Sequence, residues 1–225
     1  MIDKFVPDIA TAMAGIKDGD AIMLGGFGNV GQPIALVDYL AEMGLKNLTI
    51  IANNAGAAFG GMTKLLETEA IAKVVCSYPR STESSIFADL YRDGKIQMEL
   101  TPQGTLAERI RAAAAGVPAF FTPTAAGTQL GQGKETREIG GKLCVLETAL
   151  HADVALLLAW EADRWGNLSY KLTGRNFNPV MAGAAKLTIA QCLHKVELGD
   201  LPPDAVMTPG IYVNRVVHLP DASLN

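Results

Sequence analysis

The segment of residues 18–33 reads DGDAIMLGGFGNVGQP. Its apolar part predicts a buried strand over residues 20–26. Residues 33–43 predict a helix, with Pro33 suited to the first turn. Between them lies a glycine-rich stretch, residues 25–31, which we call the glycine loop. Glycine tolerates positive φ and lets the backbone approach a ligand closely. Because N–H groups at the start of a helix favour negative charge, the glycine loop is a candidate anion-binding site.

The same alternation of strand and helix continues along the first half of the chain. Further strands are predicted over residues 47–52, 72–77, 96–100 and 119–121, with helices over residues 61–69, 83–92 and 106–115 between them. This order predicts an α/β fold with an open, mostly parallel sheet and helices on both faces. Such sheets bind ligands at the carboxyl ends of their strands, in the loops that lead into helices.

The second half of the chain is less regular. Residues 122–135 predict a long loop, residues 142–147 a hairpin strand, residues 153–160 a buried strand, residues 168–170 a short strand, residues 180–186 a helix and residues 187–191 a strand. We see no internal repeat and no linker rich enough in proline, glycine or serine to divide the chain. The sequence therefore predicts a single domain over residues 1–225.

Composition excludes several classes of protein. The chain has 225 residues, 49% of them hydrophobic, and a net charge of −4. This length and apolar content argue against disorder, and the mild acidity argues against a nucleic-acid partner. No apolar run approaches the ~20 residues of a membrane span. The N-terminus lacks the pattern of a signal peptide, so we expect a cytoplasmic protein.

The cysteines and histidines are scattered. Cys76, Cys144 and Cys192 lie far apart in apolar surroundings, which indicates buried free thiols rather than a disulfide framework. The three histidines show no helical ligand spacing, so no metal site is expected.

Two functional interpretations of the glycine loop compete. Gly26, Gly28 and Gly31 fit the GxGxxG pattern of dinucleotide-binding loops, between a predicted strand and a predicted helix. That pattern also requires an acidic residue about 20 positions further on, at the end of the second strand. The corresponding strand end carries Asn53 and Asn54 instead.

The second interpretation rests on a longer pattern. Residues 18–33 contain an acidic residue and glycine, apolar residues, Gly-Gly-Phe and then Gly-x-Pro. Together with residues 53–56, 101–109, 133–138 and 166–179, they resemble the alpha (A) subunit of family I coenzyme A transferases over essentially the whole chain. Residues 163–167 and 208–211 look most like the 3-oxoadipate branch, with succinyl-CoA:acetoacetate transferases as close neighbours. The resemblance implies the CoA-transferase (NagB/RpiA-like) fold.

The resemblance also implies a ping-pong reaction that transfers coenzyme A from an acyl-CoA to a carboxylic acid. In this family a glutamate in a Glu-Asn-Gly or Glu-Gly-Gly motif of the beta (B) subunit forms the covalent intermediates. This chain contains no Glu-Asn or Glu-Gly pair. We therefore expect a partner B subunit in a heterodimer or heterotetramer. No permanently bound cofactor is expected, with coenzyme A as substrate and covalent intermediate.

The resemblance assigns roles to individual residues. It implies that Gln103 contributes to the oxyanion hole and that Asn53 and Asn54 line the substrate cleft. Coenzyme A binding is implied for Gly25, Gly26, Phe27, Gly28, Asn29, Val30 and Gly31. The residues alone also allow plain structural roles, with the glycines serving packing and the polar residues serving turns. The missing nucleophile leaves open a non-catalytic subunit that binds an acyl-CoA.

Overall fold

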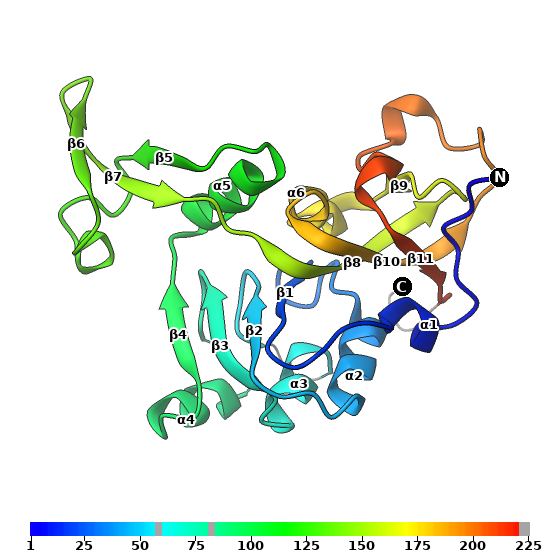
Figure 1. Cartoon of the computed structure of the whole chain (residues 1–225), viewed down its shortest axis with the longest axis horizontal. Helices are drawn as coiled ribbons and strands as arrows, with labels where there is room; N and C mark the ends of the chain where they lie inside the picture. Colours follow the sequence, from blue (N-terminus) through cyan, green and yellow to red (C-terminus); the bar gives the residue numbers. More distant parts are fainter. Residues whose placement is uncertain (57–59, 81–83, 221–225) are drawn as a thin grey trace.

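The computed structural model describes residues 1–56, 60–80 and 84–220. Its main sheet has the strand order β11-β10-β8-β1-β2-β3-β4, with β9 paired to β8 (Figure 1). The strands are β1 (Ala21–Leu24), β2 (Leu48–Ile51), β3 (Ile71–Cys76), β4 (Gln97–Leu100), β8 (Ala152–Ala162), β9 (Leu168–Ser169), β10 (Ala185–Lys195) and β11 (Arg215–His218). All pairs are parallel except β8 with β9, which confirms the predicted mostly parallel sheet.

Helices cover both faces of this sheet. One face carries α1 (Ile9–Met13), α2 (Ile34–Glu42), α3 (Met62–Glu67) and α4 (Ile86–Arg92), and the other carries α5 (Gln103–Ala114) and α6 (Asn178–Ala182) (Figure 1). Successive strand residues point to opposite faces, so each strand feeds both cores. In β1, Ile22 and Leu24 join the core under α2 and α3, whereas Met23 packs with Leu106 and Met181 on the other side.

The direction of winding changes beside β1. From β1 the chain builds β2, β3 and β4 successively to one side, whereas β8, β10 and β11 extend the sheet to the other side. Loops on either side of such a switch point diverge and leave a crevice at the carboxyl edge of the sheet. The glycine loop follows β1 and therefore opens into this crevice.

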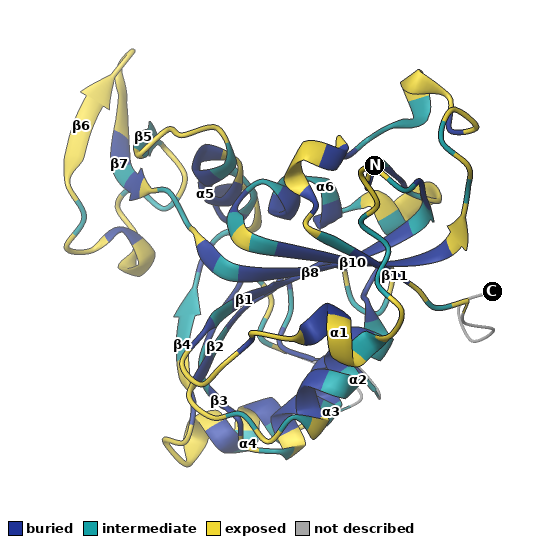
Figure 2. Cartoon of the chain, turned by 45° about the vertical axis from the view of Figure 1, so that its right-hand side comes forward, coloured by how far each residue is buried: buried dark blue, intermediate teal, exposed yellow. Residues whose placement is uncertain are grey.

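A small antiparallel sheet projects from the body as an arm (Figure 1). It consists of β5 (Ala119–Thr122), β7 (Lys142–Thr148) and β6 (Thr136–Ile139), and its connecting loop contains the 3-10 turn η1 (Gln129–Gly131). The strand predicted over residues 119–121 therefore exists but does not extend the parallel sheet. Its backbone pairs with the hairpin strand β7 instead, and β6 is exposed along its length (Figure 2).

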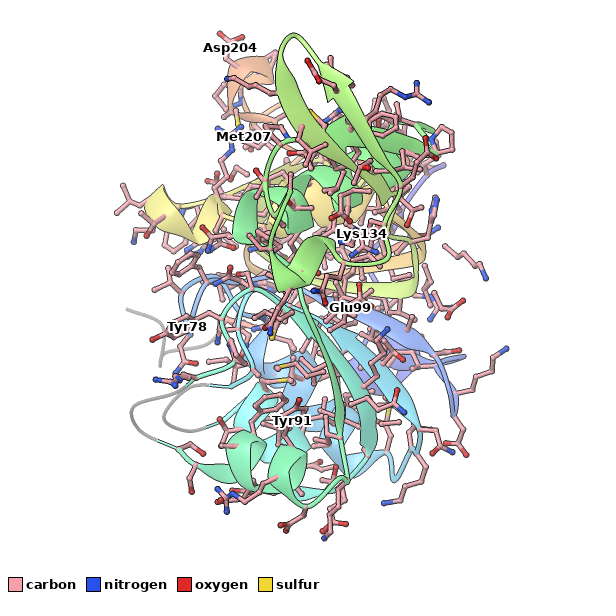
Figure 3. All side chains as sticks on the ribbon, turned by 90° about the vertical axis from the view of Figure 1, so that its left-hand side faces the viewer. Tyr78, Tyr91, Glu99, Lys134, Asp204 and Met207 are labelled. Carbon is pink, nitrogen blue, oxygen red and sulfur yellow. The ribbon has the colours of Figure 1, made fainter. Side chains whose placement is uncertain are left out.

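A network of charged side chains joins the arm to the body. Arg109 of α5 donates from Nη1 to Glu99 of β4 at 2.7 Å and from Nε to the carbonyl of Thr148 at 2.9 Å. Lys134 from the arm loop forms an ion pair with the buried Glu147. Figure 3 faces this junction and labels Glu99 and Lys134. Partial burial acts to raise the pKa of Glu99. Hydrogen bonds from Arg109 and Lys73 outweigh this effect and hold the pKa below its usual range.

Several boundaries differ from the sequence predictions. The predicted helix over residues 180–186 is wrong at its end, because α6 ends at Ala182 and Ala185 already belongs to β10. The long parallel register with β8 overrides the helical preference of these small residues. Helix α5 begins at Gln103 rather than at residue 106, and α4 begins at Ile86. Residue 83, where that helix was predicted to begin, lies outside the described residues. Sequence analysis did not predict α1, β6, β11 or the short 3-10 turns η2 (Leu172–Arg175), η3 (Pro203–Ala205) and η4 (Gly210–Tyr212).

Candidate active site

The predicted site residues lie at one edge of the sheet. The glycine loop follows β1, Asn53 and Asn54 come shortly after β2, and Gln103 opens α5 just beyond β4. These strands are parallel, so their carboxyl ends share an edge. Direct hydrogen bonds connect Asn54 with Gly28 and Gln103 with Asn53. The structure therefore places residues from the three predicted segments together.

The tip of the glycine loop is a tight turn. The N–H of Phe27 donates to the carbonyl of Val30 at 3.0 Å, and the N–H of Val30 donates to the carbonyl of Phe27 at 3.2 Å. Gly28 lies within this turn with a φ of +61°, a conformation that favours glycine. The turn leaves the side chains of Phe27 and Val30 about half exposed, at 52% and 51%.

Three asparagine side chains hold the glycine loop in place. Asn54 Oδ1 accepts from the N–H of Gly28 at 2.8 Å, and Asn176 Oδ1 accepts from the N–H of Gly26 at 3.1 Å. Asn178 is fully buried, and its Nδ2 donates to the carbonyl of Gly31 at 2.9 Å. Asn176 and Asn178 belong to a segment that matched the family pattern, but sequence analysis gave them no role.

These contacts bear on the anion site predicted from the sequence. That prediction rested on exposed N–H groups where the glycine loop meets the following helix. In the structure, the N–H groups of five loop residues already donate to partners within the chain: Gly25, Gly26, Phe27, Gly28 and Val30. These five groups therefore shape the loop, and anion binding at the helix start stays a prediction.

Gly25 is required by close packing. A Cβ atom at this position would overlap the carboxamide of Asn178. That carboxamide also accepts from the N–H of Leu158 at 3.0 Å and donates to the carbonyl of Gly174 at 2.9 Å. Asn178 thus ties β8 and the turn before α6 to the loop, in space that only a glycine at residue 25 leaves free.

Gln103 makes a specific polar contact at the start of α5. Its Nε2 donates to Oδ1 of Asn53 at 2.8 Å, and Asn53 is only 2% exposed. The same Oδ1 accepts from the hydroxyl of Ser77 at 2.8 Å. Sequence analysis treated Ser77 only as the end of a strand. The first N–H groups of a helix lack partners within it and carry partial positive charge, so α5 also favours negative charge beside Gln103.

Two pockets flank the glycine loop. One, of about 500 Å³, is lined by Phe27, Val30, Leu172, Thr173, Arg175 and Asn176. The other, of about 410 Å³, is lined by the loop and by β8, β10 and residues 170–174. Among the described lining residues, the charged ones are Arg175 and Lys171, and none is acidic. The surroundings of the loop therefore suit a ligand with apolar and anionic parts.

The chain's thiols do not supply a nucleophile there. Cys76, Cys144 and Cys192 are free and buried, as predicted. Burial raises the pKa of Cys76 to about 11 and that of Cys192 to about 12, so both remain protonated at neutral pH. Within the described ranges, no group of three or more His, Cys, Asp or Glu residues is arranged to hold a metal ion. In the same ranges, no helix is long and apolar enough to span a membrane.

Comparison with known proteins agrees with this architecture. The family model for coenzyme A transferase matches residues 6–219. The A subunit of 3-oxoadipate CoA-transferase from Pseudomonas putida is 54% identical over 99% of this chain and 96% of that protein. The A subunit of succinyl-CoA:3-ketoacid coenzyme A transferase from Helicobacter pylori strain J99 is 44% identical over 96% of this chain and 92% of that protein.

Solved structures share the fold. The acyl-CoA transferase YdiF of Escherichia coli O157:H7 matches with a TM-score of 0.84 and 23% identity over 99% of this chain. This chain spans only 48% of the YdiF chain. The decarboxylase AibA/AibB also matches, with a TM-score of 0.82 and 26% identity over 97% of this chain and 84% of that chain. The fold alone therefore does not decide the reaction.

The family match supports the transferase interpretation of the glycine loop over the dinucleotide interpretation. It also confirms the resemblance that residues 18–33 indicated. The chain belongs to the coenzyme A transferase family, and its close sequence relatives are A subunits of the 3-oxoadipate and succinyl-CoA:3-ketoacid types.

Proposed function

We propose that this chain is the A subunit of a heteromeric enzyme that transfers coenzyme A from succinyl-CoA to a 3-oxo acid. The observation that carries the proposal is the Gln103–Asn53 pair, which lies at the same sheet edge as the glycine loop. The 54% and 51% identity to two 3-oxoadipate transferase A subunits favours 3-oxoadipate as acceptor. Acetoacetate is the next candidate, since the succinyl-CoA:3-ketoacid relatives are 44% and 49% identical.

The proposed reaction uses a glutamate of a partner B subunit. Its carboxylate attacks the thioester carbonyl of succinyl-CoA, and the tetrahedral oxyanion collapses to a mixed anhydride as coenzyme A leaves as thiolate. The thiolate then attacks the glutamyl carbonyl and releases succinate, which leaves a glutamyl-CoA thioester. The 3-oxo acid takes the coenzyme A by the reverse steps and restores the glutamate. Covalent catalysis divides one difficult exchange into easier steps.

Gln103 is proposed to stabilise the oxyanions. One N–H of its carboxamide donates to Asn53, and the second N–H is the group we assign to the reacting carbonyl oxygen. A neutral amide suits this role because it donates hydrogen bonds without competing as a nucleophile. Loss of one such donor typically lowers turnover by about 100–1000-fold.

The glycine loop is proposed to bind the coenzyme A ester. Its residues 25–31 are held by Asn54, Asn176 and Asn178, so the loop is formed before substrate arrives. The flanking pockets offer apolar walls together with Lys171 and Arg175. Coenzyme A combines an apolar chain with anionic phosphates, which fits this surface.

The proposal includes the organisation of the enzyme. Residues 1–225 act as a single domain that pairs with a B subunit in a heterodimer or heterotetramer in the cytoplasm. The absence of any Glu-Asn or Glu-Gly pair from the sequence supports the need for that partner. No permanently bound cofactor takes part.

A substrate assay of the complex with the co-purified partner tests this function. We expect thioester formation on a 3-oxo acid that depends on succinyl-CoA, and a fall in kcat of about 100–1000-fold in Gln103→Ala. The KM for the acyl-CoA should change much less. Gln97→Ala is the matched control, because Gln97 is an exposed residue at the other end of β4.

Four outcomes would contradict the proposal or one of its parts. A complex that forms no thioester on any 3-oxo acid would refute the activity, and an unchanged kcat in Gln103→Ala would refute the oxyanion role. Acyl-CoA binding without turnover would favour a regulatory subunit, and tight NADH binding would favour the dinucleotide interpretation.

A further inference from the structure

We propose that Ser77 is a positioning residue for the transfer reaction, which fixes the Asn53 carboxamide and through it the donor group of Gln103. This inference rests on the oxyanion role proposed for Gln103. It adds a residue that neither the sequence pattern nor the comparisons single out.

The strand order places Ser77 beside the contact between Asn53 and Gln103. Asn53 follows β2 and Gln103 follows β4, and β3 lies between these strands. Neighbouring strands are about 4.8 Å apart, so the two backbones are separated by roughly twice that distance at the sheet edge. The Asn53–Gln103 hydrogen bond of 2.8 Å therefore spans the end of β3. Ser77 is the first residue after β3 and contacts this bridge.

Ser77 contacts Asn53 three times. Its hydroxyl lies 2.8 Å from Oδ1 and 3.0 Å from the backbone carbonyl of Asn53. Its backbone N–H donates to the same carbonyl at 3.0 Å. The backbone contact aligns the ends of β2 and β3 and does not depend on the side chain at residue 77. The hydroxyl contact to Oδ1 is the one that restrains the asparagine side chain.

The side-chain contacts converge on one oxygen. Oδ1 of Asn53 accepts from both Ser77 and Gln103, and the described residues provide no other hydrogen bond to this oxygen. Without the hydroxyl, the carboxamide is held through Oδ1 by Gln103 alone, and the two flexible amides are free to shift together. Oxyanion donors act only when they are preorganised, and a misplacement of about 1 Å can cost on the order of 100-fold in rate.

The test compares Ser77→Ala with Ser77→Thr in the complex with the co-purified partner. We expect Ser77→Ala to lower kcat by about 10–100-fold while the KM for the acyl-CoA changes little. Ser77→Thr retains the hydroxyl and should recover most of the activity. Thr68→Val is the matched control, since it removes a hydroxyl bond of 2.7 Å to Leu65 at the end of α3 and should leave kcat unchanged.

A double variant separates positioning from a structural role. If Ser77 acts through Gln103, the change Ser77→Ala should cost almost nothing further once Gln103→Ala is present. If Ser77→Ala lowers kcat as much in the Gln103→Ala background as in wild type, the inference is overturned. It is also overturned if Ser77→Ala has normal kcat while Gln103→Ala is impaired. Normal activity of Gln103→Ala would instead refute the proposed oxyanion role itself.

The thermal unfolding midpoint of each variant is measured as a control for correct folding. Should Ser77→Ala fail to fold, Ser77→Cys serves in its place, because a thiol preserves the bulk but is a weak donor. We expect the same loss of kcat for Ser77→Cys, and wild-type kcat in this folded variant would overturn the inference.

Discussion

The substitution Gly25→Ala tests whether the glycine loop is held by the buried Asn178. The added methyl group would occupy space that the Asn178 carboxamide fills. The backbone of Gly25 is not in the left-handed region, so alanine introduces no strain in φ. Asn178 must therefore move away, and its three hydrogen bonds with Leu158, Gly31 and Gly174 are lost.

The expected cost follows from those three bonds. Loss of each bond leaves a polar backbone group without its partner, which costs about 1–2 kcal/mol of stability. The free energy of unfolding should therefore fall by roughly 3–6 kcal/mol. A chain of this size loses about 2–4 °C of unfolding midpoint for each kcal/mol. We therefore expect the unfolding midpoint to decrease by roughly 6–24 °C.

Differential scanning calorimetry on matched variants measures this shift. Gly104→Ala is the control, because a Cβ at that position meets nothing within 4 Å apart from its own helix, and the residue lies in the first turn of α5. Alanine is favoured over glycine in a helix, so this variant should not be less stable than wild type. In a chain that already carries Asn178→Ala, the substitution Gly25→Ala should lower the unfolding midpoint much less. An unfolding midpoint of Gly25→Ala equal to that of wild type would refute this account of the loop, as would an undiminished cost in the Asn178→Ala background.

Two further predictions concern the body of the fold. Arg109→Met should lower the free energy of unfolding by about 1–3 kcal/mol, because Glu99 and the carbonyl of Thr148 lose a donor. Arg111→Met should lower it much less, since the Arg111 side chain is 53% exposed and that of Arg109 only 11%. Equal unfolding midpoints for the two variants would contradict the anchoring role of Arg109. In the folded chain, burial raises the pKa of Cys76 from 9.0 to about 11 and that of Cys192 from 9.0 to about 12. The unfolded chain loses these protons at a lower pH than the folded chain. The stability that the two thiols contribute is therefore complete below pH 9 and is lost as the pH rises above 9. The unfolding midpoint should therefore fall between pH 9 and 11 more steeply in wild type than in Cys76→Ala, and parallel curves would contradict this.

Much of the sheet could be predicted from the sequence. Strands β1, β2, β3 and β4 and their helices follow from apolar runs that alternate with helical periodicity, since local pattern and tertiary fold agree there. The carboxyl-edge location of the site follows from the same alternation. The glycine loop stands out because it lies between a predicted strand and a predicted helix. The roles of Gln103 and Asn53 came from the resemblance to the A subunits of coenzyme A transferases, since the residues alone also allow plain turn roles.

Other features depend on contacts between distant parts of the chain. The sequence of residues 180–186 favours a helix, but pairing with β8 converts its end into β10. The strand at residues 119–122 joins the arm because its partner β7 follows only after a long loop. Asn178 holds Gly31, which lies 147 positions away in the sequence, and Ser77 contacts Asn53, which lies 24 positions away. No local sequence pattern indicates such contacts.

The central claim is that this chain supplies the oxyanion donor while a partner supplies the nucleophile. Its most direct test is the intact mass of each chain after the complex is incubated with succinyl-CoA without an acceptor acid. We predict that the partner chain gains the mass of covalently bound coenzyme A and that this 225-residue chain keeps its own mass. A coenzyme A adduct on this chain, or active complex in which neither chain carries one, would contradict the account.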